Sequence, residues 1–267
     1  MSSKKRTKKG QKAKGGPAQA SQVSPLKVVD PADGVERVLV ITAHPDDVDF
    51  GAAGTVAVMT KAGVEVVYCL VTDGDAGGSD LDTTQEQRAA IRRREQTAAA
   101  ACVGVDRLIF LGHLDGQVEA NLSLRKDLSR VIRQVRPDRV ICQSPEINLE
   151  RIYASHPDHL EAGAAALRAV YPDARNPFAF PELLDNEGLE PHTVPEVWVM
   201  AMQSPDVVVD TTKAFDAKLA ALSSHVSQVG DGSHLPELLG NWGRMVAGAA
   251  GLKPTRLAEA FKVVNTA

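Results

Sequence analysis

Cysteine is scarce in this chain, which has three cysteines among 267 residues. They are Cys69, Cys102 and Cys142, and no two of them form a CxxC pair. This argues against a disulfide framework and against a zinc site made of cysteines. Cys69 and Cys142 fall within apolar runs, where buried free thiols are common. We therefore expect reduced thiols and a cytoplasmic location.

Long apolar runs are also missing. No stretch of 18 apolar residues occurs, so we expect no membrane-spanning helix and no membrane partner. Apolar residues nevertheless make up 43% of the chain and charged residues 24%, which is the balance of a globular protein. A chain of this length can bury a full core without disulfide bonds.

Acidic residues are absent from the first fourteen positions, which carry seven Lys or Arg. No apolar segment follows them, which argues against a secretory signal. We interpret residues 1–33 as a disordered basic tail that is dispensable for the function of the rest of the chain, with a nucleic-acid-binding arm as the alternative. Subtracting the +7 of these fourteen residues from the formal net charge of −4 leaves −11, which disfavours nucleic acid as a partner.

The rest of the chain, residues 34–267, alternates between apolar runs and helical stretches. The first run, RVLVITA at 37–43, is continuous, as in a strand buried on both faces. Further strands are predicted at 64–72, 107–111, 139–144, 196–202 and 207–210, and helices at 52–62, 83–105, 122–135, 155–170 and 211–224. The alternation predicts an α/β fold with a Rossmann-like, doubly wound, mainly parallel sheet and helices on both faces.

Two segments between these elements carry further expectations. Thr84 and Gln87 match a capping box at the start of the second predicted helix. Segment 172–195, rich in Pro, Asn, Asp and Glu, is predicted to be a long loop, and one interpretation makes it a lid over the site. The Gly-rich segment 72–78 lacks both GxGxxG and the P-loop Gly-Lys-Ser/Thr, which disfavours nucleotide binding.

Polar residues crowd together directly after the first predicted strand. His44, Asp46, Asp47 and Asp49 all belong to the stretch AHPDDVD. Ligands of open α/β sheets bind beyond the carboxyl ends of the strands, where this stretch lies. Carboxylates this close repel one another unless a cation lies among them. A tight turn rich in Pro and Asp is the alternative for this motif taken alone.

A second motif, SHPDH, follows the fourth predicted strand and contains His156, Asp158 and His159. Taken alone it is also compatible with a helix cap. Loops after neighbouring strands meet in one crevice, so we expect the two motifs to form one site. Imidazoles with carboxylates suit zinc, or Fe(II) as the alternative, with an open position for water. A carboxylate that is not a ligand can act as a general base.

The two motifs resemble those of the PIG-L/LmbE-like family of metal-dependent N-acetylglucosaminyl deacetylases. Weaker similarity at 92–116, 218–229 and 257–264 extends the resemblance over roughly residues 37–264. It implies a single LmbE-like metal-dependent hydrolase domain over residues 34–267.

The resemblance also implies roles for individual residues. His44, Asp47 and His159 match the metal ligands, with Zn²⁺ the implied ion and Fe²⁺ the alternative. Asp46 matches the general base. His156 matches the histidine that stabilises the oxyanion and protonates the leaving amine.

Other residues receive weaker assignments. Many family members have an acidic residue directly after HPDD, where this chain has Val48. Asp49 stands one position later, so we expect it to support the metal ligands or to contact the substrate. Tyr153 lies near the second motif and is a candidate to polarise the substrate carbonyl. The remaining histidines are isolated and expected to have surface or core roles; they are His113, His192, His225 and His234.

The implied activity is zinc-dependent hydrolysis of an N-acetyl or other N-acyl group on an N-acetylglucosamine-like sugar or sugar conjugate. Two alternatives stay open: an amidase that cleaves a thiol–sugar conjugate, and a non-catalytic metal- or sugar-binding protein. The expected partner is a small molecule. Assembly into a homo-oligomer is left open.

Overall fold

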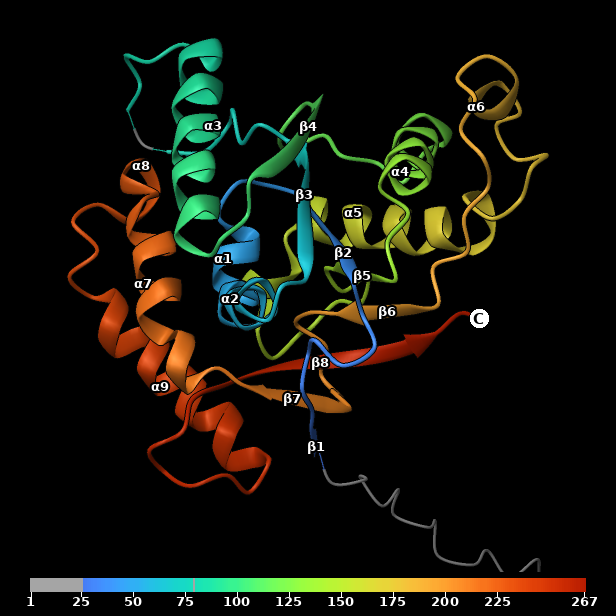
Figure 1. Cartoon of the computed structure of the whole chain (residues 1–267). Coiled ribbons are helices and arrows are strands. Elements are labelled where there is room, and N and C mark those ends of the chain that lie inside the picture. The colour runs from blue at the N-terminus through green and yellow to red at the C-terminus, as the bar shows by residue number, and fades with distance from the viewer. Residues whose placement is uncertain (1–25, 79) are drawn as a thin grey trace, which may run out of the picture.

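The computed structural model describes residues 26–78 and 80–267, and the remaining residues lie outside the described part. Its strands are β1 Lys27–Val28, β2 Arg37–Thr42, β3 Glu65–Thr72, β4 Arg107–His113, β5 Arg139–Cys142, β6 Glu196–Val199, β7 Val207–Asp210 and β8 Ala258–Asn265. Its helices are α1 Asp47–Gly51, α2 Ala53–Lys61, α3 Gln85–Cys102, α4 Leu122–Val135, α5 Pro157–Arg168, α6 Glu182–Asp185, α7 Phe215–Ser223, α8 Val226–Val229 and α9 Leu235–Ala249 (Figure 1). The 3-10 and π segments are η1 Ile152–Ser155, η2 Ala169–Asp173 and η3 Thr212–Ala214.

The sheet is mainly parallel, as the sequence predicts. Its strand order is β1-β7-β8-β6-β5-β2-β3-β4, and among the described strands β8 alone runs antiparallel to its neighbours. Helices cover both faces of the sheet (Figure 1). The predicted Rossmann-like α/β fold is therefore confirmed.

The chain changes direction across the sheet between β2 and β5. From β2 it proceeds outward to β3 and β4, and it then returns to place β5 and β6 on the other side of β2. Such a reversal leaves a crevice beyond the carboxyl ends of the two strands that flank it. The two predicted motifs follow β2 and β5, so the topology brings both of them to this crevice.

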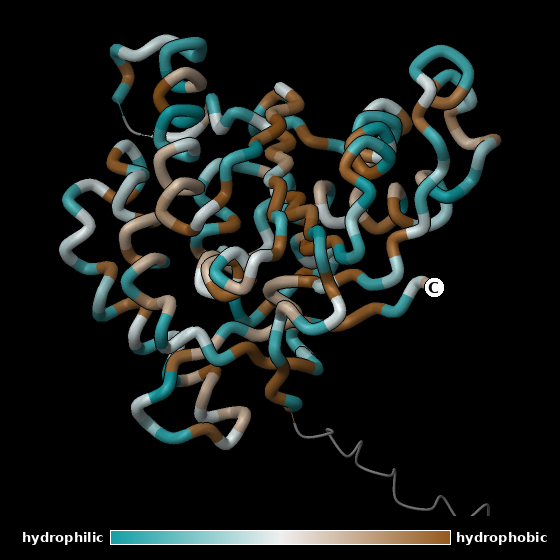
Figure 2. Tube along the Cα trace, viewed as in Figure 1, coloured by the Kyte–Doolittle hydropathy of each residue, from teal (hydrophilic) through white to brown (hydrophobic). Residues whose placement is uncertain are grey.

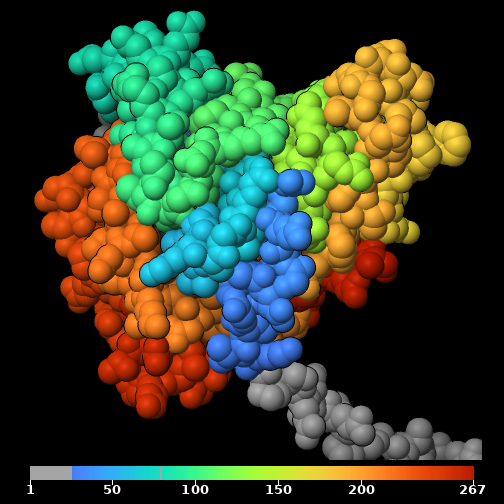
Figure 3. Space-filling model, viewed as in Figure 1, coloured from blue at the N-terminus to red at the C-terminus, as the bar shows by residue number. Residues whose placement is uncertain are grey.

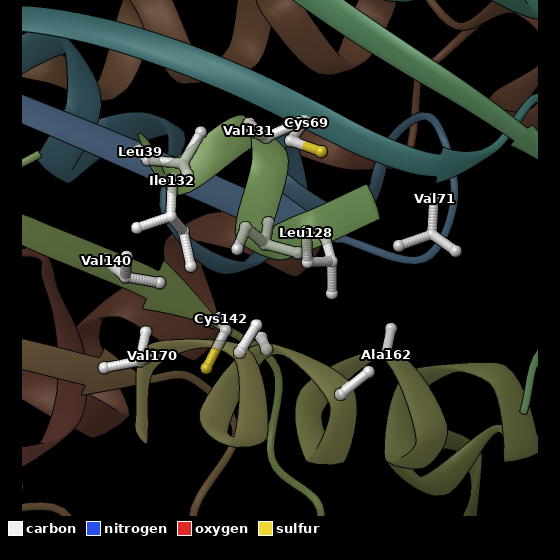
Figure 4. Packing of buried hydrophobic residues seen from close by; sticks show 14 of the residues in the cluster. Leu39, Cys69, Val71, Leu128, Val131, Ile132, Val140, Cys142, Ala162 and Val170 are labelled. Carbon is white, nitrogen blue, oxygen red and sulfur yellow. The ribbon is translucent and has the colours of Figure 1, made fainter. Parts of the chain in front are cut away.

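The core forms two layers, one on each face of the sheet. Along β2, Leu39 and Ile41 belong to the layer covered by α4 and α5, whereas Val38 and Val40 belong to the layer under α2, α3 and α7. Figure 4 shows Leu128 of α4 in the first layer, and in Figure 2 hydrophobic residues gather in the central strands. Both faces of β2 are buried, which is why its sequence is a continuous apolar run.

Several described elements were not among the predicted ones, and the two longest of them are α9 and β8. Helix α9 contains Gly240, Gly243 and Gly248, and glycine is a poor helix former. Its helical state instead reflects tertiary packing, with Leu235 and Leu239 buried in the protein. By contrast, the predicted capping box of α3 is confirmed.

The state of the cysteines and the apolar character of the helices can be read from the structure. Cys69, Cys102 and Cys142 are all free, and Cys69 and Cys142 are buried in the core. No helix within residues 26–78 and 80–267 combines the length and apolar character that crossing a bilayer requires.

The predicted boundary between tail and domain needs a correction. Residues 27 and 28, assigned to the tail, form β1 and pair in parallel with Val207 and Val208 of β7. Arg139 of β5 also donates a hydrogen bond to the carbonyl of Pro31 at 2.6 Å. The folded part therefore begins before residue 34. The predicted disorder of residues 1–25 lies outside the described residues.

Segment 172–195 is not a lid over the motifs. Helix α5 begins at the second motif and runs away from it towards α6, at the right of Figure 1, where Figure 3 shows a projecting gold lobe. Within the segment, His192 contacts the carbonyl of Pro137, just before β5 begins, at 2.8 Å. Arg133 of α4 also donates to the carbonyls of Ala174 and Asn176. Within the described residues, the hydrogen bonds and ion pairs of this segment join it to α4, to the residue before β5 and to the end of β8, and none joins it to the two motifs.

Truncation tests where the folded part begins. A chain starting at residue 26 is expected to keep the wild-type kcat and the wild-type free energy of unfolding. A chain starting at residue 34 loses β1 and the packing of Val29 and Ala32. Its unfolding free energy should fall by about 1–3 kcal/mol, as measured by urea denaturation. Loss of kcat in the folded chain that starts at 26 would contradict the assignment of a dispensable tail.

Candidate active site

The first motif forms a tight strand-to-helix turn. Strand β2 ends at Thr42, and the carbonyl of Ala43 accepts hydrogen bonds from the N–H and hydroxyl of Thr72 on β3. Asp46 then takes a left-handed backbone conformation, with φ of 87°, and caps the start of α1. The N–H of His44 donates to Oδ2 of Asp47 at 2.7 Å. The turn thus aims several polar side chains into the crevice.

The second motif forms the start of α5. His156 is the N-cap residue, its Nδ1 accepting the N–H of Asp158 at 3.2 Å, and Pro157 occupies the first turn, as it does in many helices. A Cβ at Gly163 would lie 2.3 Å from the carbonyl oxygen of Gln143, so only glycine lets α5 pack this close to the end of β5. The side chain of Gln143 also accepts the N–H of Ala43 at 2.8 Å. This bond joins the ends of β2 and β5, from which the two motifs follow.

The three predicted metal ligands lie against one another. His44 Nδ1 is 3.2 Å from His159 Nε2 and 3.4 Å from Asp47 Oδ2. His159 Nε2 lies 2.9 Å from Asp47 Oδ1. Ligands bound at about 2.0–2.2 Å to a tetrahedral zinc are about 3.3–3.6 Å apart. The two imidazole nitrogens have about the spacing of ligands around one such ion, and Asp47 faces each of them with a different oxygen. His156 also offers a donor atom within 4.8 Å of those of His44 and His159.

The electrostatics of the cluster also suit a cation. Asp47, Asp115 and Asp158 all place a carboxylate oxygen within 3.4 Å of a ring nitrogen of His44. Burial lowers the pKa of His44, but hydrogen bonds to Asp115, Asp158 and Asp47 outweigh it and raise the pKa to about 12. The pKa of Asp47 lies far below its ordinary value, because the effect of burial is outweighed by the neighbouring His159 and His44. The donor set therefore fits a divalent metal.

Two carboxylates that were not assigned from the sequence orient His44. Its Nε2 lies 3.1 Å from both Asp158 Oδ2 and Asp115 Oδ1. Asp158 is also fixed by the N–H groups of Gly116 and Val118, at 2.7 and 3.3 Å. Carboxylates placed this way keep the imidazole proton on Nε2, the nitrogen that faces them. They leave Nδ1 free to bind a metal. The position of Asp158 between two histidines of SHPDH was the one sign in the sequence that it belongs to the site.

Asp46 stands beside the ligand set but is held differently. Its Oδ2 accepts a hydrogen bond from Arg92 Nη2 of α3 at 2.9 Å, and the same guanidinium donates to the carbonyl of Pro45. Burial and the charge of Asp47 raise the pKa of Asp46 to about 7, against the opposing effects of Arg92, His225 and His44. A carboxylate with this pKa can accept and return a proton near neutral pH.

His156 completes a triangle of imidazoles. Its ring centroid lies 5.0 Å from that of His44 and 5.3 Å from that of His159. Burial and these two neighbouring rings lower the pKa of His156, which favours its neutral form. Because Nδ1 accepts the N–H of Asp158, the ring proton of the neutral form is placed on Nε2. An exposed N–H donor therefore remains on His156.

The structure places Asp49 away from the crevice, whereas the role suggested for Tyr153 stays a prediction. Asp49 is fully buried and bonds Gln96 and His225 instead of facing the crevice. Tyr153 is 73% exposed, and its hydroxyl accepts a hydrogen bond from Arg151. His225, like Asp49, is fully buried.

Replacing Asp158 tests how His44 is oriented. Asp158→Asn should weaken zinc binding by about 10- to 100-fold, because an amide cannot accept from His44 and the two backbone N–H groups as the carboxylate does. Competition with a chromophoric chelator would measure the affinity. Asp185→Asn, on the exposed α6, is the matched control and should bind zinc as the wild type does. Equal affinities in both variants would contradict this role.

These features define a class of protein: an α/β protein with a histidine–carboxylate centre in the crevice of a doubly wound sheet, suited to a hydrolytic metal. Comparison with known proteins identifies the family. The family model described as PIG-L: GlcNAc-PI de-N-acetylase matches residues 39–170, which contain both motifs.

Individual relatives agree with this match. A diacetylchitobiose deacetylase from Thermococcus kodakarensis is 33% identical over 203 residues, covering 76% of this chain and 74% of that protein. A probable N-acetyl-alpha-D-glucosaminyl L-malate deacetylase 2 from Bacillus cereus is 31% identical over 199 residues, covering 72% and 83%. The structure of N,N'-diacetylchitobiose deacetylase from Pyrococcus horikoshii matches with a TM-score of 0.81 and 29% identity, covering 90% and 87%. The chain therefore belongs to the PIG-L family.

Proposed function

We propose that this protein is a zinc-dependent deacetylase that hydrolyses the N-acetyl group of an N-acetylglucosamine-like sugar or sugar conjugate. The observation that carries the proposal is the convergence of His44, Asp47 and His159, with Asp46 beside them and not among them. The relatives named as deacetylases of diacetylchitobiose and of an N-acetylglucosaminyl malate support the substrate class. Fe²⁺ is the alternative ion for the same donors.

A divalent metal held by His44, Asp47 and His159 would lower the pKa of a bound water and polarise the amide carbonyl. Asp46 accepts the proton of the attacking water, since its raised pKa of about 7 suits proton transfer near neutral pH. Arg92 keeps the Asp46 carboxylate oriented during this step.

His156 is assigned to the carbonyl oxygen of the substrate. Its Nε2–H donates to the oxygen on which negative charge develops as the amide carbon becomes tetrahedral. Because the pKa of His156 is lowered, its ring is mainly neutral. A neutral ring can donate a hydrogen bond but is a poor source of a proton. We therefore assign return of the proton to the leaving nitrogen to Asp46, which took it from water. The carbon–nitrogen bond then breaks to give acetate and a free amine.

The proposal extends to the setting of the enzyme. A small sugar or sugar conjugate is the partner, and the three free thiols are compatible with a cytoplasmic enzyme. Neither nucleic acid nor a membrane is a proposed partner. Whether chains associate is best measured directly, by light scattering of the purified protein.

A substrate panel tests the proposal. Acetate and free amine should be released in equal amounts from N-acetylglucosamine, N,N'-diacetylchitobiose or N-acetylglucosaminyl malate by the zinc-loaded protein. Chelation of the metal should abolish release, and added Zn²⁺ should restore it. Cleavage of a thiol–sugar amide in preference to the acetamides would favour the amidase alternative. One bound metal per chain without turnover on the whole panel would favour a binding protein and overturn the proposal.

A further inference from the structure

The backbone of Asp46 is held in a conformation that residues other than glycine rarely adopt. Its φ of 87° lies in the left-handed region, and its carbonyl caps α1 by accepting the N–H groups of Asp49 and Phe50. Such a conformation persists only where the surroundings fix it. The contacts that fix it therefore decide where the Asp46 carboxylate points.

A chain of three buried side chains leads to this backbone. Gln96 Oε1 accepts the N–H of Asp46 at 2.8 Å, and Gln96 Nε2 donates to Asp49 Oδ2 at 2.9 Å. His225 Nε2 lies 2.9 Å from the same Asp49 oxygen. Gln96, Asp49 and His225 are each 0% exposed, so none of them can contact substrate directly.

We infer that Gln96, Asp49 and His225 form a relay that positions Asp46 for proton transfer. The inference rests on the proposed function, in which Asp46 is the base. These three are positioning residues, since they act only through Asp46. They also give Asp49 a specific role, which the spacing of the first motif left open.

The chemistry of the relay fixes the order of its donors and acceptors. A carboxylate that only accepts obliges Gln96 to turn its NH₂ towards Asp49, which leaves its carbonyl oxygen for the N–H of Asp46. A glutamine meets both demands at once. Leucine meets neither, and glutamate would place a second carboxylate against Asp49.

Helix α3 holds Asp46 at two points. Arg92 and Gln96 are four residues apart, so they lie on the same face of the helix, and both are buried. Arg92 binds the carboxylate of Asp46, and Gln96 binds its backbone N–H. With the side chain and the main chain both bound to one rigid helix, the carboxylate has little freedom to turn away from the crevice.

The test compares Gln96→Leu, Gln96→Glu and the double variant Gln96→Glu/Asp49→Asn. Each single Gln96 variant should lower kcat by about 10- to 100-fold, the usual effect of displacing a catalytic group by about an ångström. KM and zinc content per chain should stay near wild-type values. The double variant should recover most of kcat, because the introduced asparagine can donate to both the introduced glutamate and the His225 ring. That glutamate can still accept the N–H of Asp46.

A second readout does not depend on activity. Hydrogen exchange of the Asp46 amide, measured by NMR, should be slow in the wild type, faster in Gln96→Leu and slow again in the double variant. Asp173→Asn is the control, because it weakens the partly buried pair of Asp173 with Arg125 elsewhere in the fold. This control should lose stability but keep the wild-type kcat and the protection of the Asp46 amide.

The outcomes separate the relay from the proposed function. The relay is overturned if the Gln96→Leu variant is folded and loaded with zinc, yet its kcat stays within about twofold of wild type. It is also overturned if the Asp46 amide stays protected from exchange in this variant. If Gln96→Leu does not fold, the relay is tested with Gln96→Glu and the double variant instead. The two measurements are again kcat and the hydrogen exchange of the Asp46 amide. Wild-type protein without turnover on any substrate would overturn the proposed function, whereas the exchange data would still decide the relay.

Discussion

Asp46→Asn is expected to lower kcat by about 10²- to 10⁴-fold, the contribution of a positioned general base. The amide keeps the size of the side chain and can still accept a hydrogen bond from Arg92, but it cannot take the proton of the attacking water. Steady-state release of amine from the best substrate of the panel measures the change. Zinc content should stay at the wild-type level, since Asp46 is not one of the three converging ligands.

The control for this substitution is Asp206→Asn. Asp206 is paired with Lys262 at the start of β7, away from the two motifs, so its loss should leave kcat unchanged. Undiminished kcat in Asp46→Asn with bound zinc would remove Asp46 from its assigned role. Loss of zinc together with activity would instead make Asp46 a ligand.

His159→Ala is expected to abolish both zinc binding and turnover. The substitution leaves two donors, His44 and Asp47, where a catalytic zinc takes three protein ligands. Elemental analysis after gel filtration should fall from about one zinc per chain to background. Saturating Zn²⁺ at 100 times the dissociation constant should raise the unfolding free energy of the wild type by about 2.7 kcal/mol. It should leave His159→Ala unchanged.

His192→Ala is the matched control for this second prediction. His192 contacts the carbonyl of Pro137 near the start of β5, whereas the second motif follows the end of β5. It should bind zinc and respond to it as the wild type does. If His159→Ala retained one tightly bound zinc, the ion would have to lie elsewhere, for example among His44, Asp115 and Asp158, whose donor atoms also lie close together.

Most of the sheet could be predicted because its strands carry strong local signals. The continuous apolar runs at β2, β3 and β5 reflect burial on both faces, and that burial is visible in composition alone. The start of α3 was recognisable because Thr84 and Gln87 form a capping box within four residues. In α9, three glycines weaken the local signal and tertiary packing decides the structure.

The lid interpretation failed for a different reason. Composition shows that 172–195 is irregular, but it does not show against which part of the fold such a segment packs. Its place follows from the direction of α5, because this helix leads the chain away from the second motif before the segment begins. Arg133 then fixes the segment through several of its carbonyl groups.

The sequence by itself determined the two motifs and the strands that precede them. Their meeting in one crevice depended on the strand order, which makes β2 and β5 neighbours. Ligand types can be read from residues adjacent in the chain, because strand and turn geometry are local. Only the tertiary structure decided what each further carboxylate does. Asp158 meets Val118 across 40 residues and Asp49 meets His225 across 176, and no local pattern records such contacts. A carboxylate becomes a ligand, a base or an anchor according to the partners that folding brings to its oxygens.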